Sequence, residues 1–329
     1  MMFKRDGCGK ALLGLLVFCT GLTPSIGSGQ AYPTRPITLV TPYAAGSGID
    51  AMARLVGLHL GQRLGQPVIV DNKPGASGNI GSELVAKSAP NGYTLMVQST
   101  PLVVTPALYK NVPYNPVTDF THLVKIGIGS MALVVNPVVL PVKTFQELVA
   151  AIRARPGKIN YGSSGNGTPH HLGMELLKQQ LGLDVVHIPY KGATAAVTDL
   201  LAGQVQMALF PVNAVLPHAK AGKLHVIAVS GKGRSVLAPD SPSFDEVGLP
   251  MLDLDLYYFI SGPANLPRDI VTRLSQDIAT IMRSADMREA MLKLGNEAAT
   301  STPEELTALI RTDVERWKKF ISETKIAAD

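Results

Sequence analysis

One unit recurs along this 329-residue chain: an apolar run, a loop rich in Gly, Ser or Asn, and a helical pattern with one apolar face. It occurs as ITLVTPY–AAGSG–IDAMARLVGLHLGQRLG and PVIVDN–KPGASG–NIGSELVAKSA, and again as INYGS–SGNGTP–HHLGMELLKQQLG and VVHIPY–KGA–TAAVTDLLAG. Strand-like runs that alternate with helical patterns are typical of βαβ units. The repeat therefore predicts an α/β fold with mostly parallel sheets.

The predicted helices begin at recognisable capping signals. The C-terminal part of the chain turns helical, with one amphipathic stretch from Arg268 to Leu294 and another helix that ends near Lys325. At four helix starts, a side chain can accept a hydrogen bond from a backbone N–H of the first turn, and at one of them a proline occupies the first helical position. These starts are Ser47-x-x-Asp50, Asn79, Thr168-Pro169 and Thr302-x-x-Glu305.

The units fall into two groups, which a long strand-like stretch from Val124 to Asn136 separates. This arrangement predicts two α/β lobes, the first made of residues 32–136 plus 257–329 and the second of residues 137–256. Two chain crossings between lobes make a hinge, and ligands of open α/β sheets bind at the carboxyl ends of the strands. We therefore expect a central ligand cleft to which the Gly-rich loops contribute.

The first residues have the layout of a secretory leader. Three basic residues among the first ten precede the apolar stretch Ala11 to Cys19, and a small-x-small pattern follows at Gly29-Gln30-Ala31. A lipid anchor at Cys19 is disfavoured, because bulky Phe18 precedes it where a small residue is expected. No later stretch is long and apolar enough to span a bilayer. We expect residues 1–31 to be a cleaved signal peptide, and the mature chain to reside in the periplasm.

Cysteine content and charge exclude several function classes. Both cysteines, Cys8 and Cys19, lie in the leader, so the mature chain has no disulfide, thiolate nucleophile or cysteine metal ligand. Without the charged residues of the leader, the formal charge falls from +5 to about +3. The basic residues are scattered, which argues against nucleic acid as a partner. A mild positive charge suits an anionic small ligand.

The Gly-rich loops are suited to binding anions. A helix N-terminus offers unsatisfied N–H groups and the positive end of a dipole, and small residues allow close backbone approach. Several such loops at one edge could clamp a carboxylate at either end. We predict ligand contacts from the first lobe at Tyr43, Ala45, Gly46, Ser47, Asp50, Ala76, Ser77, Gly78, Asn79, Ser99 and Thr100, and from the second at Ser164, Asn166, Gly167, Thr168, Tyr190 and Phe210.

The first loop also matches a dinucleotide fingerprint, Gly46-x-Gly48-x-x-Ala51. In that fingerprint the first glycine comes directly at the strand end, whereas here Pro42 to Ala45 intervene. The next loop, KPGASG, has the same anion-binding character. Dinucleotide binding is therefore disfavoured, and no cofactor is expected.

Enzyme hypotheses find little support in the residues. His171 and Glu175 lie one helical turn apart and could be two metal ligands, but there is no evident third ligand and no HExxH. Ser163-Ser164-Gly165 does not match the nucleophile elbow G-x-S-x-G. We expect neither catalytic residues nor a metal, although an exported hydrolytic or metal-dependent enzyme acting on a small carboxylate remains the alternative.

Several motifs together resemble the extracytoplasmic solute-binding proteins of tripartite tricarboxylate transporters, the Bug family. They are YPTRPITLVTPYAAGSGID, DNKPGASGNIG, APNGYTL, LYKNVPYNPVTDF, KINYGSSGNGTPHHL, VHIPYKGATAAVTDLLAGQVQ, LPHAKAGKLHVIAV and TPEEL. The resemblance implies a two-lobed periplasmic binding protein of the type II-like kind that closes on a small organic acid. It also implies that the loops at Tyr43 to Gly48, Ala76 to Asn79, SGNGT and PYKG hold carboxylates.

The chain departs from the family pattern at two places. The first loop reads PYAAGSGID where the family usually resembles PFPPGGGTD, and Phe210 and Pro211 stand where the family usually has an Asp-Asn pair. A buried carboxylate would have to meet the ammonium group of an amino-acid ligand. If Phe210 reaches the ligand, the site should prefer a carboxylate with an apolar or aromatic body. The alternative is that Phe210 points into the core of the second lobe.

These observations favour a non-catalytic, monomeric binding protein for a small organic carboxylate. The resemblance implies that it delivers this ligand to the membrane permease subunits of a tripartite tricarboxylate transporter or to a sensor ectodomain.

Overall fold

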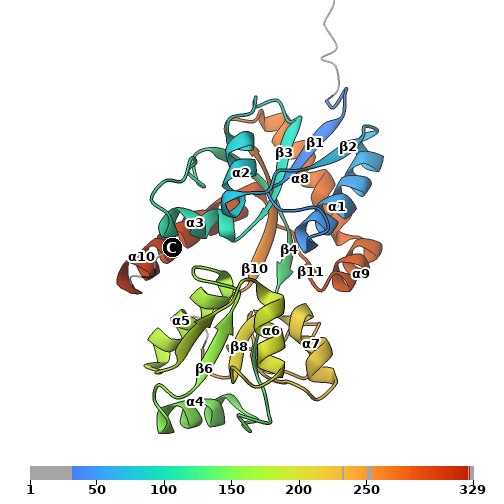
Figure 1. Cartoon of the computed structure of the whole chain (residues 1–329). Coiled ribbons are helices and arrows are strands. Elements are labelled where there is room, and N and C mark those ends of the chain that lie inside the picture. Colours follow the sequence, from blue (N-terminus) through green and yellow to red (C-terminus); the bar gives the residue numbers. More distant parts are fainter. Residues whose placement is uncertain (1–31, 232, 250–253, 325, 327–329) are drawn as a thin grey trace, which may run out of the picture. The chain divides into compact units, whose positions relative to one another are not determined.

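Two separate β-sheets organise the computed structural model, which describes residues 32–231, 233–249, 254–324 and 326 (Figure 1). The predicted leader, residues 1–31, lies outside the described residues. In chain order the elements are β1 (Ile37–Thr41), α1 (Gly48–Leu64), β2 (Val68–Asn72), η1 (Ala76–Gly78), α2 (Asn79–Ala86), β3 (Thr94–Ser99), α3 (Pro101–Leu108), β4 (Phe120–Gly129), β5 (Met131–Val135), α4 (Phe145–Ala154), β6 (Asn160–Ser163), α5 (Pro169–Leu181), β7 (Val186–Pro189), α6 (Ala193–Leu201), β8 (Met207–Pro211), α7 (Val212–Lys220), β9 (His225–Val229), β10 (Leu256–Pro263), α8 (Arg268–Arg283), α9 (Ala285–Lys293), β11 (Glu297–Ala298) and α10 (Pro303–Thr324).

The first sheet has six strands in the order β11-β4-β10-β3-β1-β2. Strand β1 pairs in parallel with β2 and β3, as expected for two consecutive βαβ units. Strand β10 enters between β3 and β4 and runs antiparallel to both. Helices α8 and α10 pack against β4, so these C-terminal helices lie on the first sheet.

The second sheet has five strands in the order β7-β6-β8-β5-β9. Strand β6 pairs in parallel with β7 and β8, whereas β5 runs antiparallel to β8 and β9. Figure 1 shows helices α5 and α6 beside strands β6 and β8 of this sheet. Both sheets are therefore mixed, and the expectation of mostly parallel sheets holds only for the βαβ units.

The stretch from Val124 to Asn136, predicted as one long strand, is two strands in two different sheets. Strand β4 ends at Gly129, and β5 begins at Met131 and pairs with β8 and β9. The chain therefore changes sheets at Ser130, and β5 is a strand of the second sheet. The predicted division into two domains, residues 32–136 plus 257–329 and residues 137–256, stays a prediction.

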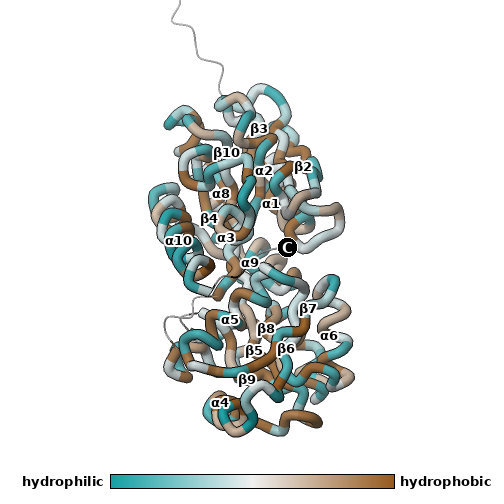
Figure 2. Tube along the Cα trace, turned by 60° about the vertical axis from the view of Figure 1, so that its left-hand side comes forward, coloured by the Kyte–Doolittle hydropathy of each residue, from teal (hydrophilic) through white to brown (hydrophobic). Residues whose placement is uncertain are grey.

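Strand β5 is apolar throughout (MALVV) because both faces of its sheet are covered. Met131, Leu133 and Val135 belong to one buried cluster, while Ala132 and Val134 belong to a second cluster on the other face. Successive side chains of a strand point to opposite faces, so a strand buried on both sides needs no polar positions. The tube in Figure 2 is hydrophobic along this part of the second sheet and alternates along α10.

Capping predictions are confirmed at two helices and wrong at a third, and one predicted helical stretch is divided by a further cap. Thr168 caps α5, and Thr302 and Glu305 exchange hydrogen bonds of 3.1 and 2.8 Å at the start of α10. Asn79 is not an N-cap: α2 begins at this residue, and its Oδ1 accepts from the Tyr114 hydroxyl at 3.1 Å. The stretch Arg268 to Leu294 is two helices, because the Ser284 hydroxyl caps a new helix, α9.

Among the helices of the described residues, none combines the length and hydropathy needed to cross a bilayer.

Candidate functional site

Hydrogen bonds of Asp50 shape the first loop, between β1 and α1. The Asp50 side chain is only 3% exposed; one carboxylate oxygen accepts from Gly46 N at 2.8 Å and Arg54 Nε at 3.0 Å, and the other from Asn72 Nδ2 at 2.9 Å. Burial raises the pKa of this carboxyl, but its hydrogen bonds with Arg54, Gly46 and Asn72 outweigh burial and lower it. Asp50 therefore fixes the loop instead of facing a ligand.

The predicted capping box at this helix is half formed. Ser47 Oγ accepts from Asp50 N at 3.3 Å, but the carboxylate returns to Gly46 N and not to Ser47 N. Gly46 has φ 81°, a left-handed conformation that glycine adopts without strain. Ala45 and Gly46 are exposed at the surface of the loop, and Ser47 is half-buried.

Gln98, at the end of β3, connects the first and second loops, and it was not among the predicted contacts. Its Oε1 accepts from the Tyr43 hydroxyl at 3.0 Å and from Ser99 N at 2.9 Å, while its Nε2 donates to Ser82 Oγ at 3.1 Å. Ser82 in turn donates to Gly78 O at 2.9 Å. A polar residue directly after the apolar run LMV of β3 is the sequence signal that could have identified Gln98.

The second loop, before α2, is held by close packing on the end of β1. A Cβ placed on Gly81 would lie 2.8 Å from Pro42 Cβ and 3.0 Å from Pro42 Cα, so only glycine fits. Ala76 is exposed with φ 47°, and Gly78 is buried with φ 91°. The Ser77 side chain lies outside the described part of the structure.

The predicted contacts at the end of β3 and directly before α3 are buried. Ser99 is 7% and Thr100 is 5% exposed, and Thr100 Oγ1 accepts from Tyr257 N at 3.2 Å, which ties the start of α3 to β10.

The loop between β6 and α5 is organised by its own side chains. Thr168 Oγ1 donates to Gly165 O at 2.8 Å and caps α5, and Ser164 Oγ lies 2.6 Å from His170 Nδ1. Gly167 N donates to His171 Nδ1 at 3.0 Å. This amide, which we predicted to bind ligand, is therefore occupied by His171. Asn166 is exposed.

Two predicted contacts of the second lobe have internal partners. The Tyr190 hydroxyl donates to Asp199 Oδ2 at 2.8 Å. Phe210 is fully buried in the cluster on one face of the second sheet, and its ring lies 4.5 Å from that of His170. The hypothesis that Phe210 faces the ligand is thus not what the structure shows; its side chain points into the core.

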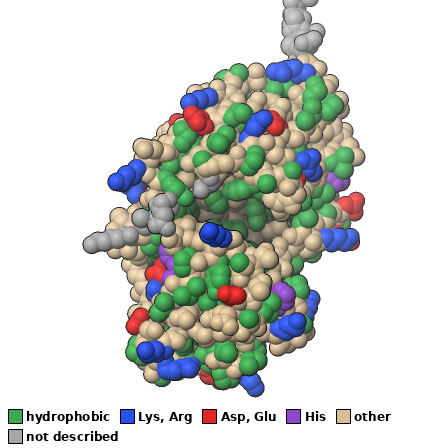
Figure 3. All heavy atoms as spheres, in the orientation of Figure 1, with side chains coloured by type: hydrophobic (Ala, Val, Ile, Leu, Met, Phe, Trp, Pro, Cys, Tyr) green, Lys and Arg blue, Asp and Glu red, His purple; other side chains and the backbone are tan. Residues whose placement is uncertain are grey.

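One pocket brings predicted residues of both lobes together. Its volume is about 240 Å³, and it is lined by Tyr43 of the first loop, by residues of α3 and the following turn, and by the loop before α5. Figure 3 shows a hollow near the middle of the molecule, on the face that is drawn, with hydrophobic side chains around the hollow. The lining residues are Tyr43, Pro101, Val104, Thr105, Leu108, Tyr109, Asn166, Gly167, Thr168 and Pro169.

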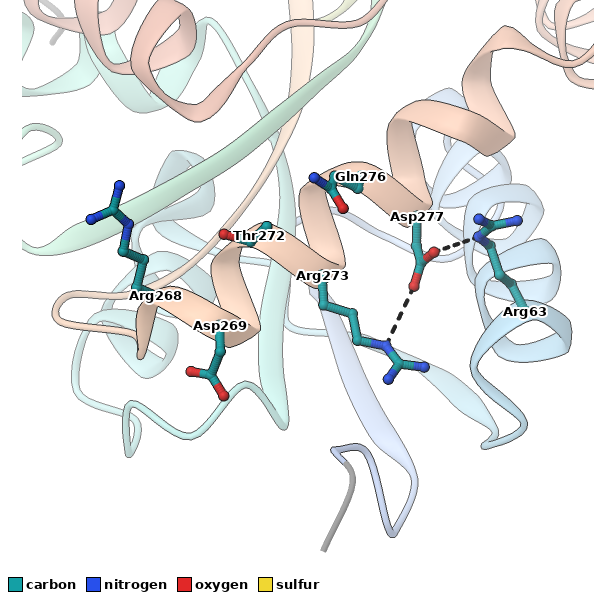
Figure 4. A pocket seen from close by; sticks show the side chains of 7 residues that line it. All are labelled: Arg63, Arg268, Asp269, Thr272, Arg273, Gln276 and Asp277. Carbon is teal, nitrogen blue, oxygen red and sulfur yellow. Dashed lines mark hydrogen bonds and ion pairs between the residues drawn. The ribbon is translucent and has the colours of Figure 1, made fainter. Parts of the chain in front are cut away.

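A larger and more open pocket of about 820 Å³ lies over α8 and α1 (Figure 4). Its charged side chains are partly paired with one another: Asp277 accepts from Arg63 Nε at 2.5 Å and lies 3.6 Å from Arg273 Nε. The pocket involves none of the Gly-rich loops, so it is not the predicted site.

The metal hypothesis for His171 and Glu175 gains no support. Within the described ranges, no group of three His, Cys, Asp or Glu side chains is placed to hold an ion. Glu175 instead accepts from the Tyr161 hydroxyl and from Lys178 Nζ, each at 2.6 Å.

Two α/β lobes and a small pocket with walls from both define a binding protein of the two-lobed periplasmic class. The family model described as tripartite tricarboxylate transporter family receptor matches residues 52–326. The chain belongs to this family, whose members are receptors and not enzymes.

Individual relatives agree with this assignment. The chain is 33% identical to Protein BugT of Bordetella pertussis over 95% of this chain and 96% of that protein. It is similar to the structure of the periplasmic binding protein BugD, with a TM-score of 0.72, 29% identity and coverage of 91% and 100% of the two chains. A Rhodopseudomonas palustris protein solved with adipate gives a TM-score of 0.75 at 31% identity over 90% and 99%. MatC from the same organism, solved with malate, gives 0.71 at 26% over 88% and 100%.

Proposed function

We propose that this periplasmic solute-binding protein captures a small organic carboxylate between its two lobes and passes it to a membrane transporter or a sensor. The observation that carries the proposal is the pocket lined by Tyr43 from one lobe and Asn166 to Thr168 from the other. At about 240 Å³ it is smaller than the roughly 300–1,000 Å³ of pockets for drug-sized ligands. A ligand of a few carbon atoms suits that volume.

Neutral groups would hold the carboxylate. Among the described residues, none that lines this pocket is charged. Helix α5, which has 13 residues, begins beside the pocket at Thr168 and Pro169. The positive end of its dipole therefore faces the pocket region. The Asn166 side chain adds an amide donor, whereas Tyr43 contributes its ring to the wall, because its hydroxyl already donates to Gln98 Oε1. We propose these residues as the ligand-binding set, together with the exposed loop positions Ala45, Gly46 and Ala76 and the half-buried Ser47.

The pocket favours a carboxylate with an apolar body. Pro101, Val104 and Leu108 of α3 form an apolar wall, which takes the role that sequence reasoning gave to Phe210. The pocket also lacks a carboxylate among its described lining residues, so the ammonium of an amino acid would have no partner there. Dicarboxylates such as adipate and malate, found with the two R. palustris relatives, are the first candidates.

A thermal-shift screen of the mature protein tests this proposal. The panel is adipate, malate, a monocarboxylate, a tricarboxylate, an aromatic acid, glutamate and NAD. A ligand at 100 times its Kd should stabilise the folded state by about 2.7 kcal/mol, which raises the Tm visibly. Stabilisation by a carboxylate other than glutamate is expected. Stabilisation by NAD alone would reject the proposal.

Hinge closure, partners and processing belong to the same proposal. Because ligand contacts are divided between two lobes, the bound ligand should favour a closed state. We propose that the protein is a monomer and needs no cofactor. X-ray scattering should then give a smaller radius of gyration when the ligand is added.

We also propose that the leader is removed on export. N-terminal sequencing of the exported protein should therefore begin at Tyr32. We propose the membrane components of a tripartite tricarboxylate transporter as partners, or alternatively a sensor ectodomain.

A further inference from the structure

The hydrogen bond between Gly167 and His171 fixes the protonation of that histidine. The Gly167 N–H can only donate, so His171 Nδ1, 3.0 Å away, must present its lone pair. His171 is therefore neutral in this arrangement, with its proton on Nε2. A second proton on Nδ1 would place two donors against each other and break the bond.

The surroundings of His171 oppose a positive charge. The residue is 7% exposed, and its ring stacks on that of His187 with centroids 4.0 Å apart and planes 9° from parallel. The His187 ring also stacks on Tyr161 at 4.8 Å. The charged groups nearby are Glu175 and Lys178, which are paired with each other at 2.6 Å. This ion pair leaves little net negative charge to stabilise an imidazolium.

His187 supports the other end of this loop through Ser163, the last residue of β6. Its Nε2 lies 2.7 Å from Ser163 Oγ, and that hydroxyl accepts from Gly165 N at 3.1 Å. The loop from Gly165 to Thr168 is thus held by two stacked histidines, one at each end.

We infer that His171 is a positioning residue for ligand binding: its neutral Nδ1 holds Gly167, and thereby the loop Gly165 to Thr168, in the conformation that receives the carboxylate. Protonation of His171 releases this loop and weakens binding. The inference rests on the proposed function, because Gly167 and Thr168 line the proposed pocket.

The direction of the pH effect follows from linkage. Burial, and secondarily Lys178, lowers the pKa of His171 below its usual value of 6.5, against the opposing effect of Glu175. Affinity should be constant while His171 stays neutral and should fall once the pH drops towards its lowered pKa, by at most about tenfold per pH unit for one proton. Burial lowers the pKa of His170 and of His187 to about 4, so these two residues act only at lower pH.

Two substitutions separate the role of Nδ1 from that of the ring. In His171→Asn the amide oxygen occupies the position of Nδ1 and can accept from Gly167, whereas in His171→Gln the amide reaches the position of Nε2. Calorimetry with adipate from pH 8 to pH 5 should show a wild-type Kd that is constant near neutral pH and rises on acidification, by at most about tenfold per pH unit. His171→Asn should keep an affinity within about threefold of wild type at pH 7.5 and show a smaller rise. His171→Gln should bind at least about tenfold more weakly at every pH. The ionisation of adipate affects all three proteins equally and cancels in the comparison. A wild-type affinity that increases on acidification, or equal behaviour of the two variants, would overturn the inference.

A measurement without ligand separates this inference from the proposed function. In ligand-free protein labelled with ¹⁵N-glycine, the Gly167 amide resonance should shift as His171 titrates, and it should stay constant in His171→Asn. If this shift occurs but neither adipate nor malate binds, the ligand class is wrong and the positioning role of His171 on the loop stands. A Gly167 resonance that ignores the histidine titration refutes the positioning role whether or not a carboxylate binds.

Discussion

The Tyr43 hydroxyl donates to Gln98 Oε1 at 3.0 Å and so joins the first loop to the end of β3. Burial raises the pKa of this phenol, which keeps it protonated and able to donate. Gln98 also holds Ser99 N and, through Ser82, the carbonyl of Gly78. One buried amide therefore sets the relative positions of three predicted ligand loops.

Gln98→Leu should destabilise the protein and impair the site together. It leaves buried donors and acceptors without partners, at a cost of about 1–3 kcal/mol in unfolding free energy. Tyr43→Phe is the matched control, because it removes only one of these hydrogen bonds and should cost about 1 kcal/mol. Urea denaturation measures both. Equal stability of Gln98→Leu and wild type would show that the amide does not organise the loops.

Much of this fold could be predicted from local patterns, and the misses have physical causes. The four βαβ units and the caps at Thr168 and Thr302 follow from periodicity and side-chain chemistry within a few residues. The break at Ser130 could not be found, because nothing in KIGIGSMALVV shows that two consecutive apolar strands join different sheets. That information lies in pairing with β8 and β10, which are distant in sequence.

The candidate site was predicted at the level of loops and less well at the level of atoms. Loop residues Tyr43 and Asn166 to Thr168 do line one pocket. Which groups remain available to a ligand depends on tertiary partners, such as Asn72 for Asp50, Asp199 for Tyr190 and His171 for Gly167. Partners brought close by the fold leave no signal in local sequence.

Gly81→Ala should destabilise the protein by about 1–3 kcal/mol, because the added Cβ would meet the backbone of Pro42 and Lys73 O at 3.0–3.1 Å. Gly48→Ala is the control: its Cβ would meet nothing within 4 Å, and alanine favours the helix by up to about 1 kcal/mol. Thermal unfolding of both variants should therefore shift the Tm in opposite directions. A stable Gly81→Ala would mean that α2 can move away from β1.

Acid should destabilise the protein through His122. This buried residue donates from Nε2 to Pro116 O at 2.9 Å, and its Nδ1 lies 2.9 Å from the Ser261 hydroxyl. Burial lowers its pKa to about 4, against 6.5 for the free side chain. The unfolded state binds the proton first, so this stability is complete above pH 6.5 and is lost as pH falls towards 4. The loss is about 3 kcal/mol in total.

Urea denaturation of wild type and His122→Phe between pH 7 and 5 measures this effect. The variant lacks the titrating group, so its stability should depend less on pH, by up to about 1.4 kcal/mol per pH unit. Identical pH profiles would show that His122 protonates equally in both states.

Leu108→Ala should weaken binding of adipate more than binding of malate. The change removes apolar surface from the α3 wall of the pocket. The binding free energy weakens by about 0.8 kcal/mol for each CH₂ group that is no longer buried in the complex. Adipate has the longer apolar chain, so its Kd should rise about three- to tenfold. Leu58→Ala, an exposed position on α1, is the control and should leave both Kd values unchanged. Calorimetry at pH 7.5 distinguishes the cases, and equal losses for the two acids would contradict the assignment of this wall.

Phe210→Asp should unfold the second lobe and should not create an amino-acid site. The ring is fully buried among Ala132, Val134 and Val229 and packs on His170, so an aspartate there would bury a charge without a partner, at a cost of several kcal/mol. Phe210→Leu, which keeps the site apolar, should cost only about 1–2 kcal/mol and leave the ligand preference unchanged. Circular dichroism and calorimetry with glutamate on both variants test this. A folded Phe210→Asp protein that binds glutamate tightly would place residue 210 at the ligand and restore the hypothesis that the structure disfavours.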